Sequence, residues 1–263
     1  MSAAGHAFRD NLTMLRRNLL HARRYPSLTL NVMLTPVMLL LLFVYVFGNV
    51  MSAGIGGRAD RADYVAYIVP GILLMTVGMT ALGTAVSVAT DMTEGIMARF
   101  RTMAISRASV LIGHVVGNVL QTLLALVAIL GIGLAIGFRP NATPVEWVAA
   151  AGLMTLVSVA LTWIAVGMGL ASPNAEGASN MGLPLTMLPL LSSAFVPVGA
   201  MPDWFRWFAE YQPFSPAIET LRGLLLGSGI GTKNAVLTLA WCAGLSVLGY
   251  VWSKGQFHRE PRR

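Results

Sequence analysis

The charged residues that could make specific contacts gather in one short segment, Asp91–Arg107, which reads DMTEGIMARFRTMAISR. Asp91 and Glu94 have the spacing of an acidic helix capping box. Arg99 and Arg101 follow toward the other end, where a helix dipole favours positive charge. Three apolar residues recur at helical spacing: Ile96, Phe100 and Met103. The pattern predicts a short amphipathic helix that suits binding to lipid or to another protein.

The surroundings of this segment place it outside a lipid bilayer. Uncharged runs flank it on both sides, at about residues 66–90 and 108–138. Each run is long enough to cross a hydrocarbon core of about 30 Å. Two interpretations of the segment stay open. It either offers a face to a cytosolic partner or is an ordinary positive loop that only fixes the topology.

The composition indicates a polytopic membrane protein. The chain is 56% hydrophobic and only 11% charged, whereas soluble domains have about 25% charged residues. The net charge of +7 would suggest nucleic acid in a soluble protein. Here the basic residues flank the apolar runs, so anionic lipid and membrane orientation explain them, and no nucleic acid is expected. The single cysteine, Cys242, lies in an apolar run and is expected to be a packed residue.

The apolar runs predict an all-α fold with six transmembrane helices. They lie at about residues 28–48, 66–90, 110–138, 145–171, 179–198 and 234–252. Residues 1–27 carry five arginines between apolar residues and predict an amphipathic helix on the cytoplasmic surface. The expected organisation is this helix, a six-span membrane domain over 28–253, and a basic tail over 254–263.

Two of the runs carry features that a plain membrane helix lacks. The fifth run holds three prolines and predicts a bent or broken helix, which either lines a cavity or is distorted by packing. In the third run, His114, Asn118 and Gln121 share one helix face. That face either makes hydrogen bonds to neighbouring helices or lines a pathway.

Residues 201–227 differ in kind from the spans. Their apolar runs are too short to cross a membrane, the aromatics suit the membrane interface, and the prolines predict two short helices joined by a turn. We expect an interfacial or re-entrant hairpin. Its marked residues are Trp204, Trp207, Pro213, Pro216, Glu219 and Arg222.

The distribution of lysine and arginine predicts the orientation. The N-terminal segment, the 91–107 segment and the C-terminal tail together hold two thirds of the 18 lysines and arginines. By the positive-inside rule both termini and the central segment are cytoplasmic, and the 201–227 hairpin is external. We expect a multi-pass protein of the plasma (inner) membrane.

The sequence lacks the common motifs for nucleotide binding, hydrolysis and metal binding. It contains no Walker A motif, HExxH or GxSxG, and no Cys/His set with the spacing of metal ligands. The chain is therefore not expected to be an enzyme, to hold a metal or to bind ATP in the P-loop manner. Acidic residues are absent from the interior of the predicted spans, which weighs against a gradient-driven pump.

The run GIMARFRTMAISR from Gly95 to Arg107, followed by VLIG, resembles the signature of type-2 ABC transport permeases. It is most similar to the subgroup that contains daunorubicin/doxorubicin resistance permeases. Further landmarks of the family occur in order: Tyr67-x-x-Pro70-Gly71, Gln212-Pro-Phe-Ser-Pro216 and Glu219-x-x-Arg222-Gly223. The resemblance covers nearly the whole chain.

The resemblance implies an exporter built from two permease chains, the second being a copy or a sister chain, and two cytosolic ATPase subunits. ATP and magnesium would be bound by the ATPase, and this chain would hold no cofactor. The loop after the second span would be a coupling helix, over residues 91–107, that docks into the ATPase. The implied coupling residues are Asp91, Glu94, Gly95, Arg99, Phe100, Arg101 and Arg107.

The resemblance also implies a pathway between the two permease chains, lined mainly by spans one, two and five. Those spans offer no fixed charge, which predicts an amphipathic or hydrophobic cargo such as a drug, antibiotic, lipid or glycolipid. The candidate lining residues are Met75, Met79, Met181, Thr186, Met187 and Ser192. Methionines in spans are also ordinary packing residues, so both roles stay open.

Two competing hypotheses need no ATPase. The chain could be a gradient-driven carrier or channel, which would transport solute on its own. It could also be a non-transporting membrane scaffold or a membrane-embedded enzyme, for which the sequence offers no nucleophile and base at one membrane depth.

Overall fold

The computed structural model describes residues 26–48, 61–94 and 107–258, and these residues form helices, turns and short loops without any strand. Four helices are long and apolar enough to cross a membrane. They are α4 (Arg61–Thr93), α6 (Arg107–Ala135), α7 (Pro144–Ala171) and α11 (Thr232–His258). They correspond to the predicted spans two, three, four and six, so the chain is a multi-pass membrane protein.

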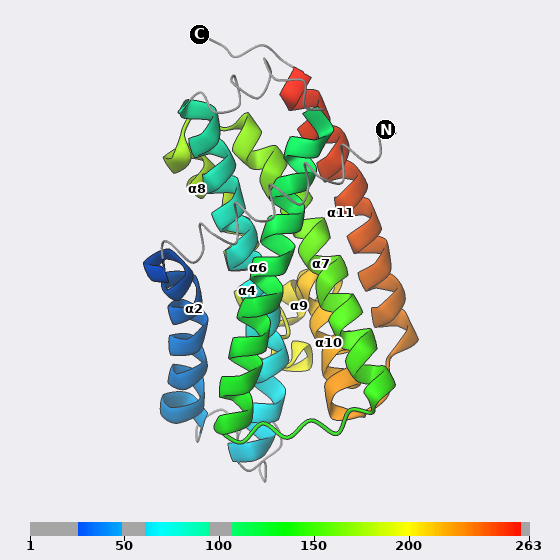
Figure 1. Ribbon diagram of the computed structural model, residues 1–263. Coiled ribbons are helices and arrows are strands. Elements are labelled where there is room, and N and C mark those ends of the chain that lie inside the picture. Colours follow the sequence, from blue (N-terminus) through cyan, green and yellow to red (C-terminus); the bar gives the residue numbers. More distant parts are fainter. Residues whose placement is uncertain (1–25, 49–60, 95–106, 259–263) are drawn as a thin grey trace.

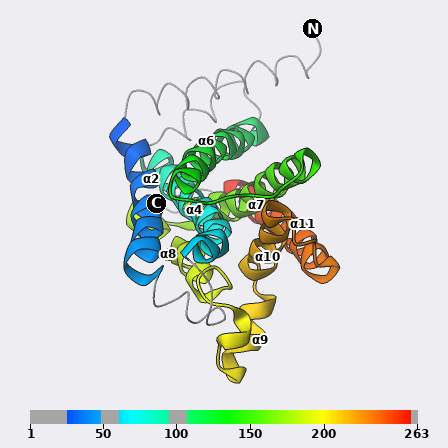
Figure 2. The ribbon, with the colours of Figure 1, turned by 90° about the horizontal axis from the view of Figure 1, so that it is seen from below.

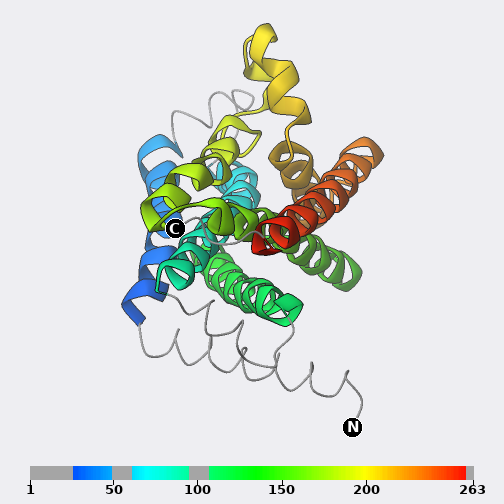
Figure 3. The ribbon, with the colours of Figure 1, turned by 90° about the horizontal axis from the view of Figure 1, so that it is seen from above.

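Helix α4 is the centre of the bundle. It contacts α2, α6, α7, α8 and α10, and views along the bundle from either end place it among these neighbours (Figure 2 and Figure 3). Of the four long helices it is the most deeply buried and α11 the least. A helix that is apolar on all sides is suited to such a position.

Three of the long helices, α4, α7 and α11, run in the same direction, and α6 runs in the opposite direction (Figure 1). The ends of α4, α7 and α11 and the start of α6 lie together at the top of Figure 1. Val88 near the end of α4 touches Gly169 near the end of α7, and the Ser253 hydroxyl near the end of α11 donates to the Trp163 carbonyl of α7. The 138–143 loop between α6 and α7 lies at the opposite end (Figure 1).

The predicted first span is helical throughout its described part. It consists of α2 (Pro26–Leu41), which contains Pro36, and a π-helical continuation, η1 (Leu42–Phe47). The apolar stretch described with side chains, Leu34–Phe47, is shorter than a full span.

The predicted fifth span is broken, as its prolines suggested. Helix α8 (Ala175–Met187) passes into a short 3-10 turn, η2 (Leu188–Leu191), and the chain then bends before a second 3-10 turn, η3 (Val198–Ala200). With 13 residues α8 rises about 20 Å, too little to cross a bilayer alone. A continuous fifth membrane helix over 179–198, and with it the regular six-span arrangement, is therefore not observed.

The hairpin after this break consists of two short helices, α9 (Asp203–Tyr211) and α10 (Phe214–Leu226), which confirms the predicted pair of helices joined by a turn. Figure 2 shows α9 projecting from the side of the bundle. Helix α10 is buried against α4, α7 and α11. It ends at Gly227, whose φ of 65° lies in the left-handed region that favours glycine.

Two glycines let other segments approach α4 closely. At Gly71 an added Cβ would lie 2.7 Å from the Cα of Ala194, in the bend after α8. At Gly78 it would overlap the carbonyl oxygen of Leu185 in α8. The broken fifth segment therefore packs closely against α4 because Gly71 and Gly78 have no side chains. This close packing brings the segment within hydrogen-bonding distance of α4 and α10.

The predicted start of the coupling helix is corrected by the structure. Asp91 lies in the last turn of α4, and the Glu94 backbone N–H still donates to the Thr90 carbonyl, so α4 continues past the expected N-cap. The two acids therefore lie at the carboxyl end of one helix. Arg107, the last of the predicted coupling residues, is the first residue of α6. Gly95, Arg99, Phe100 and Arg101 lie outside the described residues, as do the 1–27 helix up to residue 25 and the tail beyond residue 258.

Candidate functional site

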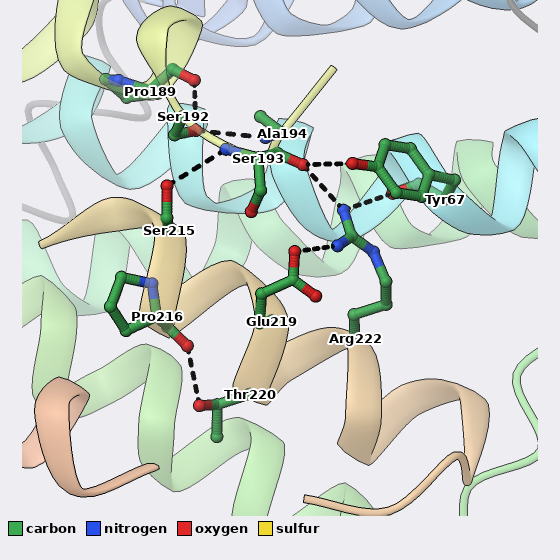
Figure 4. Close-up of polar contacts among 10 residues, drawn as sticks. All are labelled: Tyr67, Pro189, Ser192, Ser193, Ala194, Ser215, Pro216, Glu219, Thr220 and Arg222. Atoms are coloured by element: carbon green, nitrogen blue, oxygen red, sulfur yellow. Dashed lines mark hydrogen bonds and ion pairs between the residues drawn. The ribbon is translucent and has the colours of Figure 1, made fainter. Parts of the chain in front are cut away.

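A buried arginine organises the junction between α4, α10 and the bend after α8. The Arg222 guanidinium pairs with the Glu219 carboxylate one turn earlier on α10, at 2.6 Å. Its other terminal nitrogen donates to two backbone carbonyls, Tyr67 at 3.1 Å and Ser193 at 3.0 Å (Figure 4). The side chain is only 10% exposed, so its charge depends on these acceptors rather than on water.

Tyr67 of α4 closes this cluster. Its hydroxyl donates to the same Ser193 carbonyl at 2.9 Å, and its ring lies under the Arg222 guanidinium, 3.8 Å from carbon to ring centroid. Figure 4 shows both donors converging on the Ser193 oxygen. One carbonyl in the bend therefore joins two helices whose contributing residues are 155 positions apart.

The bend itself is held by serine and glutamine side chains. The Ser193 backbone N–H donates to the Ser215 hydroxyl of α10 at 3.1 Å (Figure 4). The Ser192 hydroxyl donates to the Pro189 carbonyl and accepts from the Ala194 N–H. At the turn between α9 and α10, the Gln212 side chain donates to the Leu188 carbonyl at 3.0 Å. Backbone groups released where the fifth segment breaks thus find partners on the hairpin.

Beside the cluster lies a polar cavity of about 500 Å³. Its walls come from α4, the segment before α9, both hairpin helices and the start of α11. The lining residues that carry charge or hydrogen-bonding groups are Tyr67, Arg206, Glu210, Ser215, Glu219, Arg222 and Asn234. A volume of this size is typical of small-ligand pockets. Across the described residues, no group of three His, Cys, Asp or Glu side chains could hold a metal ion.

The predicted hairpin residues divide between surface and core. Trp204 and Trp207 of α9 are 82% and 71% exposed, while Pro216 and Arg222 of α10 are buried. Pro213 stands immediately before α10, and Glu219 is partly buried beside Arg222. The structure therefore brings the Glu219-x-x-Arg222 landmark together with Tyr67 of the other landmark. The sequence did not identify four residues of this site, namely Ser193, Arg206, Glu210 and Asn234. For the first three, the only available signal was the presence of prolines and aromatic residues nearby in the sequence.

The candidate lining residues also divide. Met75, Thr186 and Ser192 are buried within the chain, and Met79 is partly buried against the core. Met181 and Met187 of α8 have exposed side chains. Of the six residues, only these two are exposed on the surface of the single chain, and a pathway role stays a prediction for the whole set.

The end of α4 that leads into the 95–106 segment is tied to α6 and α7. Asp91 lies 3.4 Å from the His114 imidazole of α6. One and two turns further along α6, Asn118 donates to Thr162 of α7 at 2.7 Å, and Thr122 donates to Thr80 of α4 at 2.8 Å. The polar face of α6 thus makes helix-to-helix hydrogen bonds, as predicted for Asn118, with Thr122 rather than Gln121 as its next member.

Comparison with known proteins shows where such an architecture belongs. Residues 9–226 match the family described as ABC-2 type transporter. The chain is 29% identical over 246 residues to the daunorubicin resistance ABC transporter permease protein DrrB1 of Streptomyces coeruleorubidus, covering 92% of this chain and 84% of that protein. It is 26% identical over 184 residues to a probable doxorubicin resistance ABC transporter permease protein, DrrC, of Mycobacterium tuberculosis, covering 67% and 66% of the two chains.

A more distant relative is nodulation protein J of Rhizobium meliloti, 26% identical over 193 residues that cover 70% of this chain and 71% of that protein. The family match takes in α4, α6, α7, α8 and the hairpin, including every residue of the Arg222 cluster. The chain therefore belongs to the ABC-2 type transporter family.

Proposed function

We propose that this chain is the permease subunit of an ATP-driven exporter that moves an amphipathic or hydrophobic cargo. A separate cytosolic ATPase, present in two copies, binds ATP and magnesium and supplies the energy. The named relatives support this proposal, because they are ABC permeases associated with resistance to daunorubicin and doxorubicin.

The observation that carries the proposal is the course of α4. One continuous buried helix runs from the Arg222 cluster, at Tyr67, to Asp91 in its last turn, just before the 95–106 segment. These two positions are 24 residues apart in the sequence, which corresponds to about 36 Å of helix. A rigid element of this length transmits a displacement at one end to contacts at the other. Movement of the 95–106 segment by the ATPase would thereby reach the hairpin.

The orientation required by this mechanism fits the arrangement of the helices. The ends of α4 and α11 and the start of α6, which lead into the central segment and the basic tail, lie at the same end of the bundle (Figure 1). We place this end in the cytoplasm by the positive-inside rule, and the end with the 138–143 loop outside the cell.

The second permease chain would lie against the flank formed by α2 and α8. Large apolar side chains are exposed there, including Met38 on α2 and Met181 and Met187 on α8. Methionine surfaces adapt to varied ligands, so a pathway between two such flanks suits an amphipathic cargo.

A double substitution in the coupling segment tests the proposal. With the ATPase present, Phe100→Asp and Arg101→Asp together should abolish cargo-stimulated ATP hydrolysis, because they remove the apolar and cationic contacts expected in the docking groove. Arg262→Asp with Arg263→Asp, a charge change of similar size in the tail, is the matched control. Unchanged hydrolysis in a correctly inserted Phe100/Arg101 variant would refute the docking role.

A further inference from the structure

The polar cavity beside Arg222 has charges of both signs, but the terminal nitrogens of its two arginines already have acceptors, and the Nε of each, which has no partner in the described ranges, is buried out of reach of solvent. Arg222 is engaged with Glu219 and with the Tyr67 and Ser193 carbonyls. Arg206 pairs with Asp203 at 3.0 Å and also donates to the Gly199 and Met201 carbonyls. An anionic ligand would therefore compete with protein acceptors for every terminal guanidinium nitrogen.

The two carboxylates that line the cavity, Glu210 and Glu219, each have one oxygen that accepts a hydrogen bond and one that accepts none from the described residues. Glu219 receives Arg222 on Oε1, and Glu210 receives the Lys233 ammonium on Oε1 at 2.6 Å. Within the described part of the chain, no hydrogen bond reaches the second oxygen of either carboxylate, nor the side-chain amide of Asn234. A carboxylate can accept about four hydrogen bonds, so most of the free capacity of this cavity is acceptor capacity.

The rest of the wall is apolar and comes from the segment before α9 and the start of α10. Pro197, Val198 and Pro216 line the cavity, and Tyr67 contributes a ring whose face Arg222 already covers. These surfaces match the apolar part of a ligand next to its polar head.

We infer that this cavity binds a protonated amine carried on an apolar body, with the ammonium between Glu210 and Glu219. An ammonium group offers three donors and no acceptor, which is the complement of what the cavity leaves free. Charge-assisted bonds to carboxylates are stronger than neutral ones and select the amine over an uncharged analogue. The role of this site in transport rests on the proposed function, whereas binding can be measured on the chain alone.

The test uses the purified full-length chain in lipid nanodiscs without ATP or ATPase. The probe is 12-(dansylamino)dodecylamine, and its N-acetylated form is the uncharged counterpart, with empty nanodiscs subtracted. We expect the amine to bind at least tenfold more tightly than the acetylated probe, and unlabelled dodecylamine to displace it. Equal binding of the two probes, or equal displacement by dodecyl maltoside or dodecyl phosphate, would overturn the inference.

Two substitutions in the Glu210–Lys233 ion pair distinguish binding of the amine by the carboxylate from a general disturbance of the hairpin. Glu210→Gln should weaken binding of the amine roughly tenfold and leave the acetylated probe unchanged. Lys233→Gln breaks the same contact but keeps the carboxylate, so the preference for the amine should persist or increase. A preference that survives in Glu210→Gln, or is lost equally in both variants, would contradict the assignment.

Glu219→Gln provides a second measurement, read together with the unfolding temperature because it also removes the counter-ion of Arg222. A folded variant should lose the preference for the amine, and one that keeps it would overturn the inference. If it unfolds, the Glu210 and Lys233 pair of variants still decides the question. Failure of amine binding alongside intact ATP-coupled transport would reject this site and leave the proposed function standing.

Discussion

Replacing Arg222 with methionine removes the charge that joins α4, α10 and the bend after α8 while keeping most of the side-chain volume. The substitution deletes the ion pair to Glu219 and the bonds to the Tyr67 and Ser193 carbonyls. Removal of one partner from a buried pair costs about 3–5 kcal/mol. The Glu219 side chain is 36% exposed and can be rehydrated, and Ser193 keeps the Tyr67 hydroxyl as a donor. We therefore expect the substitution to lower the free energy of unfolding by about 3 kcal/mol, the lower end of this range.

The single cysteine of the chain can report its thermal unfolding. Cys242 is its single cysteine and is buried in α11. A maleimide dye that fluoresces on reaction will therefore report unfolding of the purified protein during heating. A loss of about 3 kcal/mol corresponds to a fall of roughly 6–12 °C in the unfolding midpoint.

Arg206→Met is the matched control, since its partner Asp203 is 92% exposed and exposed pairs contribute at most about 1 kcal/mol. Its midpoint should fall by no more than about 4 °C. If Arg222→Met lowers the midpoint no further than Arg206→Met does, the Arg222 cluster does not hold the hairpin and the reasoning fails.

Two further predictions concern the contacts between helices. Asn118→Leu and Thr162→Val should each lower the free energy of unfolding by about 0.6–2 kcal/mol. The double variant should lose less than the sum of the two, because both substitutions break the same hydrogen bond. Strict additivity in the same thermal assay would argue against that bond. Gly78→Val should reduce the yield of folded protein sharply, because a side chain there overlaps the Leu185 carbonyl, whereas Gly83→Val on the same helix meets nothing within 4 Å and should be tolerated.

Much of the architecture follows from local pattern. Uncharged runs between charged loops predict the four long helices, because a bilayer leaves few alternatives for such runs. Prolines predict the break in the fifth segment, and the change from apolar to aromatic composition predicts the hairpin. These properties are local in the sequence, so a single chain reveals them.

The centre of the site could not be predicted in the same way. The Ser193 carbonyl becomes an acceptor for Arg222 and Tyr67 only because the helix breaks nearby and Gly71 lets the bend approach α4. Both conditions depend on tertiary packing. The expected N-cap at Asp91 failed for a related reason, since extending α4 by one turn keeps its backbone hydrogen bonds inside the helix.

The most direct test of the account is transport by the purified chain in proteoliposomes, with and without its ATP-hydrolysing partner. A fluorescent amphipathic amine should cross the membrane only when the partner and ATP are both present, and a partner unable to hydrolyse ATP should not support transport. Transport by this chain alone, driven by a proton or sodium gradient, would contradict the claim that it receives work from a separate ATPase.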